Sequence, residues 1–169
     1  MKKTIFLDID GVLQPGGWQK RFDIDRKALQ RTLTETLNAD YVRLDEYDVA
    51  AVYCDWDKAG VELLKKLLTT YEARIIISSS WRRSKTLEEL QHLFRIHDLD
   101  KYVVGAIPMP DDERPLRIQQ FMDKDHEMGK FVILDDDCWS LRQKFPDNLV
   151  CCPNRFTEKE YEQAAQILA

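Results

Sequence analysis

Two aspartates near the start of the chain are the residues best suited to chemistry. Asp8 and Asp10 directly follow the apolar run Ile5–Leu7, and Gly11 comes next. A short, bounded apolar run is typical of a buried parallel strand, and a glycine lets the backbone turn sharply after it. Taken alone, an Asp-x-Asp pair more often caps a loop. A functional interpretation therefore depends on similar clusters elsewhere.

Two further apolar runs end in polar residues in the same way. Ile75–Ile77 is followed by Ser78–Ser80 and then by Arg82, and Phe131–Leu134 is followed by Asp135–Asp137. The ligand crevice of an open parallel α/β sheet lies beyond the carboxyl ends of its strands, so we expect these side chains to share one site. Carboxylates that hold Mg²⁺ also bring phosphate oxygens to the metal, and hydroxyl and guanidinium groups would bind the remaining oxygens.

The rest of the chain alternates between strand and helix patterns. Strands are predicted near residues 4–8, 74–78, 102–106, 131–135 and 148–152. Asp57 is predicted to cap one helix, Thr86 and Thr157 open capping boxes, and Pro115 suits the first turn of another helix. This alternation predicts an α/β fold in which helices cover both faces of a parallel sheet.

The segment from about residue 14 to residue 53 is too long for a simple turn. An amphipathic helix within it is predicted by the spacing of apolar residues after Asp25, namely Leu29, Leu33 and Leu37. We therefore expect one domain over residues 1–169, with a small flap or partial cap at 14–53. Trp18, Lys20 and Arg21 in this segment could reach over the mouth of the site and contact substrate. The alternative for Trp18 is that it anchors the flap to the body.

Composition is that of a soluble domain. The chain has 169 residues, of which 44% are hydrophobic, and a formal net charge of −5, so one domain of this size can bury about 70% of its unfolded surface. Because the charge is negative, we expect no stable complex with nucleic acid. Neither a signal-peptide core nor a membrane span is found in the sequence, which predicts a cytoplasmic protein without a membrane partner.

The cysteines and histidines show no metal-binding spacing. The four cysteines are Cys54, Cys138, Cys151 and Cys152. They contain no Cys-x-x-Cys pair, so we expect buried free thiols. The three histidines are His92, His97 and His126. They are scattered along the chain, which indicates helix-surface or loop residues rather than zinc ligands.

The three clusters together resemble motifs of the haloacid dehalogenase (HAD) superfamily. Asp8–Leu13 resembles motif one, Ser79 or Ser80 motif two, and Asp135-Asp136 motif four. The sequence segments at 77–82 and 133–137 are similar to those of compact HAD domains associated with RNA-repair proteins. The resemblance implies a HAD-like Rossmannoid three-layer sandwich around a central five-stranded parallel sheet, with the first strand between those that carry the serines and the acidic triplet. The superfamily usually has a lysine at motif three, whereas the best candidates in this chain are Arg114 and Arg117.

The resemblance also implies roles for individual residues. Asp8 would be the nucleophile that forms an aspartyl-phosphate, and Asp10 would act as acid and then as base. The implied phosphate-binding residues are Ser79, Ser80, Arg82, Arg114 and Arg117. The implied ligands of a Mg²⁺ cofactor are Asp8, Asp10 through its backbone carbonyl, and Asp135 or Asp136. Crowding by other carboxylates is expected to raise the pKa of Asp10, which must carry a proton in the first step.

We therefore expect a Mg²⁺-dependent phosphomonoester hydrolase. Its phosphorylated substrate would be a small molecule or a nucleic-acid end. A bulky substrate is compatible with the site, because so small a cap leaves it open. Two alternatives remain at this point, a catalytically silent binding scaffold with the HAD fold and a metal-dependent nuclease that uses the same acids. The oligomeric state does not follow from the sequence.

Overall fold

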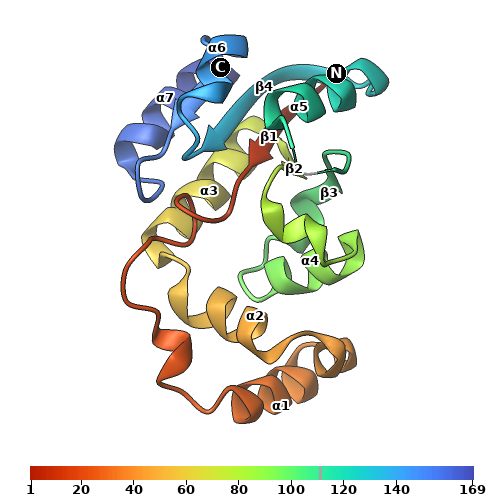
Figure 1. The fold of residues 1–169 in the computed structure, drawn as a ribbon, viewed down its shortest axis with the longest axis vertical. Helices are drawn as coiled ribbons and strands as arrows, with labels where there is room; N and C mark the ends of the chain where they lie inside the picture. The colour runs from red at the N-terminus through yellow and green to blue at the C-terminus, as the bar shows by residue number, and fades with distance from the viewer. Residues whose placement is uncertain (111) are drawn as a thin grey trace.

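The strands form one parallel sheet in the computed structural model, which describes residues 1–110 and 112–169. Within these residues the sheet has five strands in the order β3-β2-β1-β4-β5 (Figure 1). Their bounds are β1 Lys2–Leu7, β2 Arg74–Ile77, β3 Val103–Ala106, β4 Met128–Asp135 and β5 Leu149–Cys151. All four pairings are parallel. The predicted strands and the expected central place of the first strand are confirmed.

Successive residues of β1 pack alternately into two separate hydrophobic clusters. Ile5 and Leu7 pack into the larger cluster on one face of the sheet, and Phe6 packs into the smaller one on the other face. Outside the segment at 14–53, the helices that contribute to the larger cluster are α3 (Lys58–Tyr71), α4 (Leu87–Arg95) and α7 (Glu158–Leu168). Those that contribute to the smaller cluster are α5 (Arg114–Lys124) and α6 (Ser140–Lys144). The fold is thus the expected three-layer α/β sandwich.

The predicted helix starts are confirmed. The Asp57 carboxylate caps α3 by accepting the Gly60 N–H at 2.8 Å. Capping boxes at Thr86 and Thr157 begin α4 and α7, and Pro115 lies in the first turn of α5. In the described part of the chain, no helix combines the length and the apolar composition needed to cross a bilayer.

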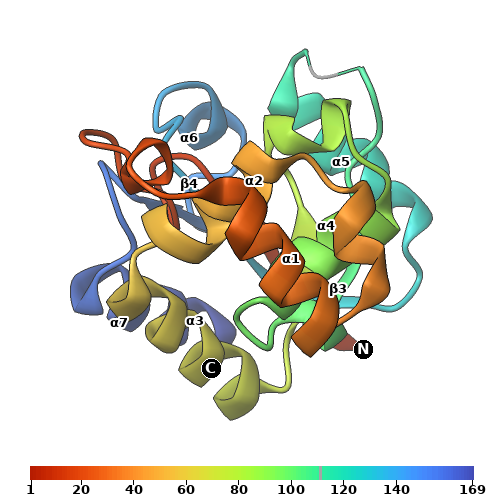
Figure 2. The same ribbon diagram turned by 90° about the horizontal axis from the view of Figure 1, so that it is seen from below.

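The segment at 14–53 is built from short helices. They are η1 (Lys20–Phe22), α1 (Arg26–Thr36), η2 (Ala39–Arg43), α2 (Glu46–Ala50) and the start of η3 (Ala51–Asp55). The helix predicted after Asp25 is α1, and the Asp25 side chain caps it. Leu33 and Tyr41 join the larger hydrophobic cluster, so this insertion packs on the body of the fold. Figure 1 shows α1 and α2 at the end of the molecule opposite the N-terminus, and Figure 2 shows them in front of the other elements when seen from that end.

The structure bears on one of the two interpretations of Trp18, namely that it anchors the flap. Its side chain is 82% exposed, and its indole N–H donates to the Asp23 carboxylate within the insertion at 2.8 Å. An anchor would have to bury its ring against the body, so the anchoring interpretation is wrong.

The expectation of four free thiols is also wrong. Cys138 and Cys151 form a disulfide, with their Cα atoms 5.4 Å apart, while Cys54 and Cys152 are free. Cys151 pairs with Asp135 across β4 and β5, and Cys138 follows Asp135 by three residues. The pairing of the strands therefore brings together two cysteines that are 13 residues apart in the sequence.

Candidate active site

The sheet register aligns the chemical residues at the ends of three strands. Leu7 of β1 pairs with Ile77 of β2 and with Leu134 of β4. The residues that directly follow these three lie at one level of the sheet, namely Asp8, Ser78 and Asp135. Because side chains alternate along a strand, residues at one level of adjacent parallel strands point to the same face. The register thus places a hydroxyl and two carboxylates side by side.

Three carboxylates meet at this point. Oxygen atoms of Asp8, Asp135 and Asp136 lie within 4.8 Å of one another. Asp8 and Asp135 are buried, whereas Asp136 is exposed. Burial, followed by the charge of Asp8, raises the pKa of both Asp135 and Asp136 above the usual value. A concentration of negative charge of this kind favours a cation.

Arg114 supplies one positive charge to the cluster. Its Nη1 donates to Oδ2 of Asp135 at 2.7 Å and to Oδ2 of Asp8 at 3.1 Å. Burial alone would lower the pKa of Arg114, but the charges of Asp135 and Asp8 outweigh this effect and hold the pKa above its usual value. Arg114 is the first residue of α5, so its guanidinium reaches the sheet from the start of that helix. Three carboxylates thus face one guanidinium.

The donor set fits a divalent metal. Oxygen ligands in carboxylates are those that Mg²⁺ prefers, and one guanidinium leaves two negative charges of the three carboxylates uncompensated. Other contacts fix the ligands in place, because Oδ1 of Asp8 accepts the Ile9 N–H at 2.8 Å and Oδ1 of Asp135 accepts the Asp137 N–H at 2.9 Å. Asp8, Asp135 and Asp136 are therefore suited to hold Mg²⁺ at the carboxyl ends of β1 and β4.

Gly11 makes room for the third carboxylate. Its φ is +76°, in the region that favours glycine. A Cβ at this position would lie 2.5 Å from Oδ2 of Asp136. The turn after β1 thus requires glycine for its backbone conformation and for the close approach of Asp136.

Asp10 lies at the outer side of the cluster. Its Oδ2 accepts the Trp81 indole N–H at 3.0 Å, and its Oδ1 accepts a Gln14 amide N–H at 3.2 Å. Burial is the largest influence on the pKa of Asp10 and raises it. The bond from Trp81 lowers this pKa and the charge of Asp8 raises it, so that the net direction is upward. A carboxyl with a raised pKa next to a carboxylate cluster is suited to proton transfer.

The three serines after β2 have different environments. Ser79 is fully buried, and its Oγ accepts the Trp81 backbone N–H at 3.4 Å as the cap of η4 (Ser80–Arg83). Ser80 is partly exposed and lines a hollow together with Asp10. Ser78, to which the sequence analysis gave no specific role, is fully buried, and its hydroxyl has no hydrogen-bond partner among the described residues. Its place next to Asp8 in the sheet register was the signal that could have identified it.

Two of the predicted phosphate-binding arginines have other contacts. Arg82 is buried and donates to the backbone carbonyls of Ser78 and Ser79 at 3.2 and 2.7 Å, which holds the loop after β2. Arg117 donates to Asp112 at 2.7 Å and to Gln120 at 2.9 Å. The structure therefore brings Arg114, but not Arg117, into contact with Asp8 and Asp135.

The hollow beside Asp10 has a volume of about 380 Å³ and an almost wholly polar wall. The insertion contributes Gln19, Arg21 and Asp48 to its lining, and the segment after β2 contributes Ser80, Trp81, Ser84 and Lys85. Arg21 pairs with Asp55 at 2.7 Å, and Lys85 pairs with Asp48 at 2.9 Å. Arg21 is one of the residues that the sequence indicated as a substrate contact, whereas Trp81 was not selected, although it directly follows Ser80.

Comparison with known proteins identifies the family. No curated protein and no solved structure matched the chain. A family model described as the HAD domain in Swiss Army Knife RNA repair proteins matches residues 4–159, which is most of the chain. The resemblance predicted from the sequence motifs is thereby confirmed. This chain belongs to the HAD superfamily, in the family of HAD domains found in Swiss Army Knife RNA repair proteins.

Proposed function

We propose that this protein is a Mg²⁺-dependent phosphomonoester hydrolase that acts through an aspartyl-phosphate on Asp8. One observation carries the proposal. Asp8, Asp135 and Asp136 converge at the carboxyl ends of β1 and β4, with Arg114 between the first two and Asp10 at the outer side. This set contains a nucleophile, a cationic partner and an acid within one site, as phosphoryl transfer requires.

Asp8 is suited to attack phosphorus. The Ile9 N–H and the Arg114 guanidinium orient its carboxylate. In the first step a carboxylate oxygen of Asp8 bonds to phosphorus while the bond from phosphorus to the ester oxygen breaks. Asp10 gives its proton to that departing oxygen. In the second step Asp10 takes a proton from the water that attacks the aspartyl-phosphate, and this attack frees Asp8 and inorganic phosphate.

The three clustered carboxylates would hold Mg²⁺, together with the backbone carbonyl of Asp10. Bound there, Mg²⁺ would supply positive charge to the phosphoryl oxygens. Arg114 adds a fixed guanidinium on the same side. Ser80 is the more accessible of the two predicted serines and is the better placed to donate to a phosphoryl oxygen, while Ser79 caps η4 and orients the loop that carries Ser80.

For the substrate we propose a bulky phosphate such as a phosphorylated nucleic-acid end. The hollow beside Asp10 is open, and its wall includes Arg21, Lys85 and the Trp81 ring. Cations contact phosphate groups, and an indole stacks on a base. The description of the family as RNA-repair-associated supports the same class. The net charge of −5 favours brief contact with a nucleic-acid end over stable binding.

The first test is Mg²⁺-dependent phosphate release from an aryl phosphate and from 5′- and 3′-phosphorylated oligonucleotides. We expect Asp8→Asn to reduce release by at least about 10³-fold, as for loss of a nucleophile. Asp10→Asn should cost about 10² to 10⁴-fold. Asp137→Asn is the matched control, because Asp137 accepts from Ser140 outside the cluster, and it should retain activity.

The outcomes separate the alternatives. Release of phosphate by the Asp8→Asn protein at the wild-type rate would overturn the mechanism. Cleavage of internal phosphodiesters would indicate the nuclease, and partner binding without turnover by the folded protein would indicate the scaffold. An oligonucleotide that neither reacts nor competes with the aryl phosphate at low salt would exclude a nucleic-acid end as substrate and leave the hydrolase proposal intact.

A further inference from the structure

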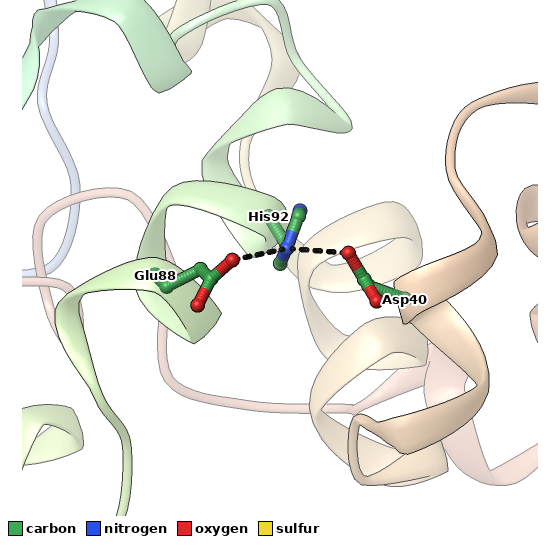
Figure 3. A group of neighbouring side chains, drawn as sticks. All are labelled: Asp40, Glu88 and His92. Carbon is green, nitrogen blue, oxygen red and sulfur yellow. Dashed lines mark ion pairs between the residues drawn. The ribbon is translucent and has the colours of Figure 1, made fainter.

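A second group of metal-ligating side chains lies where the insertion meets α4. Asp40 comes from η2 of the insertion, and Glu88 and His92 come from α4 (Figure 3). Glu88 and His92 are four residues apart, so they lie on the same face of the helix. The three residues belong to segments that are almost 50 positions apart in the sequence, and for this reason His92 was expected to be a plain surface histidine.

The two carboxylates converge on a single nitrogen atom. Oδ2 of Asp40 is 3.5 Å, and Oε1 of Glu88 is 3.9 Å, from Nε2 of His92. Figure 3 shows the imidazole between the two carboxylates. A charge-assisted N–H···O bond is shorter, about 2.7 to 2.9 Å. Nε2 carries at most one hydrogen, so it can donate well to only one of the two acids, whereas a cation can bind both acids and the nitrogen.

We propose that Asp40, Glu88 and His92 form a zinc site. Zinc bonds to carboxylate oxygen and imidazole nitrogen are about 2.0 to 2.2 Å long, which puts the ligand atoms of a tetrahedral site roughly 3.4 Å apart. The ligand atoms in this cluster lie within 4.8 Å of one another, so small side-chain rotations complete the geometry. An imidazole among the donors favours zinc over Mg²⁺ or Ca²⁺.

The surroundings leave room for a fourth ligand. A hollow of about 150 Å³ is lined by all three residues. The His92 side chain is 14% exposed, while those of Asp40 and Glu88 are 40% and 79% exposed. The nitrogen is thus sheltered and the carboxylates face solvent, so water can enter the hollow and occupy the fourth position.

A hydrogen bond already holds the segments that carry Asp40 and His92 next to each other. The hydroxyl of Tyr41, next to Asp40, donates to the backbone carbonyl of His92. The Asp40 N–H donates to the side chain of Asn38 at 2.8 Å. The other carboxylate oxygen of Asp40, Oδ1, is 3.8 Å from Arg43, while Oδ2 faces His92. Zinc would therefore bind where η2 and α4 are already in contact in the absence of metal.

Bound zinc would link the insertion to the body of the fold. Asp40 belongs to the insertion, which lines the hollow beside Asp10 through Gln19, Arg21 and Asp48. The site is separate from the Asp8 cluster, so the proposal does not depend on the proposed hydrolase activity. The role that follows is structural, since the metal would stabilise the folded state by binding only there.

The test is a zinc titration of the whole chain by calorimetry, in excess Mg²⁺ so that the oxygen-rich Asp8 cluster is occupied. Side-chain ¹H–¹⁵N spectra of the three histidines, recorded in parallel, report which ring binds the metal. We expect one zinc per chain and a shift of the His92 Nε2 resonance. Glu88→Gln and Asp40→Asn should each weaken binding at least about tenfold, because even loss of an outer-shell contact costs 10 to 100-fold.

His126→Ala is the matched control, since His126 is exposed and outside the cluster. It should bind zinc as the wild type does. Glu88 is exposed, so Glu88→Gln should fold normally and remain a fair test. Wild-type affinity in both the Glu88→Gln and the Asp40→Asn proteins, a shift at His97 or His126 in place of His92, or no zinc uptake would each overturn the proposal.

Discussion

The candidate active site has two halves that differ in how they are built. The inner half consists of Asp8, Asp135, Asp136 and Arg114; it is supplied by strand ends and the first residue of α5, and its buried charges partly neutralise one another. The outer half consists of Asp10, Trp81, Arg21 and Lys85; it lies around an open hollow and draws partly on the insertion. We propose that the inner half and Asp10 perform the reaction, and that the other outer residues select what reacts.

The comparison shows that a place in the sheet fixes a site residue more strictly than a place in a loop does. Sheet register fixes Asp8 and Asp135 to within one residue, because a shift of one would turn their side chains to the other face. The outer residues come from a turn, a short helix and an insertion, where many sequences could place a cation or a ring. If this division holds, substitutions in the inner half or of Asp10 will reduce turnover with every phosphate. Substitutions of the other outer residues will change pH dependence or substrate preference.

Apart from loss of Asp8 or Asp10, the largest effect should follow from removing the guanidinium of the inner half. Arg114→Ala leaves Asp8 and Asp135 without their shared donor, and we expect kcat/KM for an aryl phosphate to fall by about 10² to 10³-fold, as when one charge-stabilising donor is lost. Arg114→Lys should recover part of this loss, because it keeps the charge but not the planar fork. The measurement is steady-state hydrolysis at saturating Mg²⁺.

Arg117→Ala is the matched control for this prediction. Arg117 is three residues away on the same helix and pairs with Asp112, so its loss should change kcat/KM by less than about threefold. Equal losses for the two alanine variants would mean that the inner half does not depend on the contacts of Arg114 with Asp8 and Asp135.

The choice between Arg114 and Arg117 shows what the sequence could and could not predict. Both arginines follow the predicted turn before α5 and lie less than one helical turn apart, so only the three-dimensional placement of the helix shows which one reaches Asp8. The strands were predictable because each contains a short apolar run, and the runs of β1, β2 and β4 end in polar residues. The insertion was predictable as a helical segment, and Arg21 as a residue that could contact substrate, but the contribution of Asp48 to the hollow was not.

Other features escaped prediction for the same reason. The Cys138–Cys151 disulfide depends on the pairing of β4 with β5, and the Asp40–Glu88–His92 cluster depends on how the insertion packs on α4. Pairs of this kind have no fixed spacing along the chain. Periodicity and strand-end chemistry are local signals, whereas such contacts are set by packing between segments distant in the sequence.

A smaller effect should follow from filling the space that Gly11 leaves. Gly11→Ala puts a Cβ 2.5 Å from Oδ2 of Asp136, so Asp136 must move away from the cluster. We expect the Mg²⁺ concentration for half-maximal activity to rise by about tenfold or more, within the range for disturbed metal sites. The measurement is activity as a function of Mg²⁺ at fixed substrate.

Gly17→Ala separates loss of the metal site from backbone strain. Gly17 also has a positive φ, +114°, but a Cβ there meets no atom within 4 Å. Both substitutions strain the backbone by about 1 to 2 kcal/mol, which lowers the free energy of unfolding. Only Gly11→Ala should change the Mg²⁺ dependence, and an equal change in both variants would assign the effect to strain.

The smallest effect tests the outer half through pH. The Trp81 indole N–H donates to Asp10, and this bond lowers the pKa of Asp10 against the upward influence of burial and of Asp8. Trp81→Phe keeps a ring beside Trp56 and Lys85 but removes the donor, so the pKa of Asp10 should rise further. Asp10 must be protonated in the first step, and a higher pKa keeps it protonated to higher pH. The alkaline fall of kcat/KM, which reports the free enzyme, should therefore move upward by less than about one pH unit.

Trp139→Phe is the control for this shift, since Trp139 is 79% exposed and has no hydrogen bond to Asp10 among the described residues. Its pH profile should match that of the wild type. A downward shift in Trp81→Phe would contradict the role of Asp10 as the acid, because the loss of a bond to its ionised form can only favour the protonated form. An unchanged profile in both variants would assign the alkaline fall to another group. The outer half would then act on substrate selection alone, and the search for the acid would return to the inner carboxylates, where burial and Asp8 also raise the pKa of Asp136.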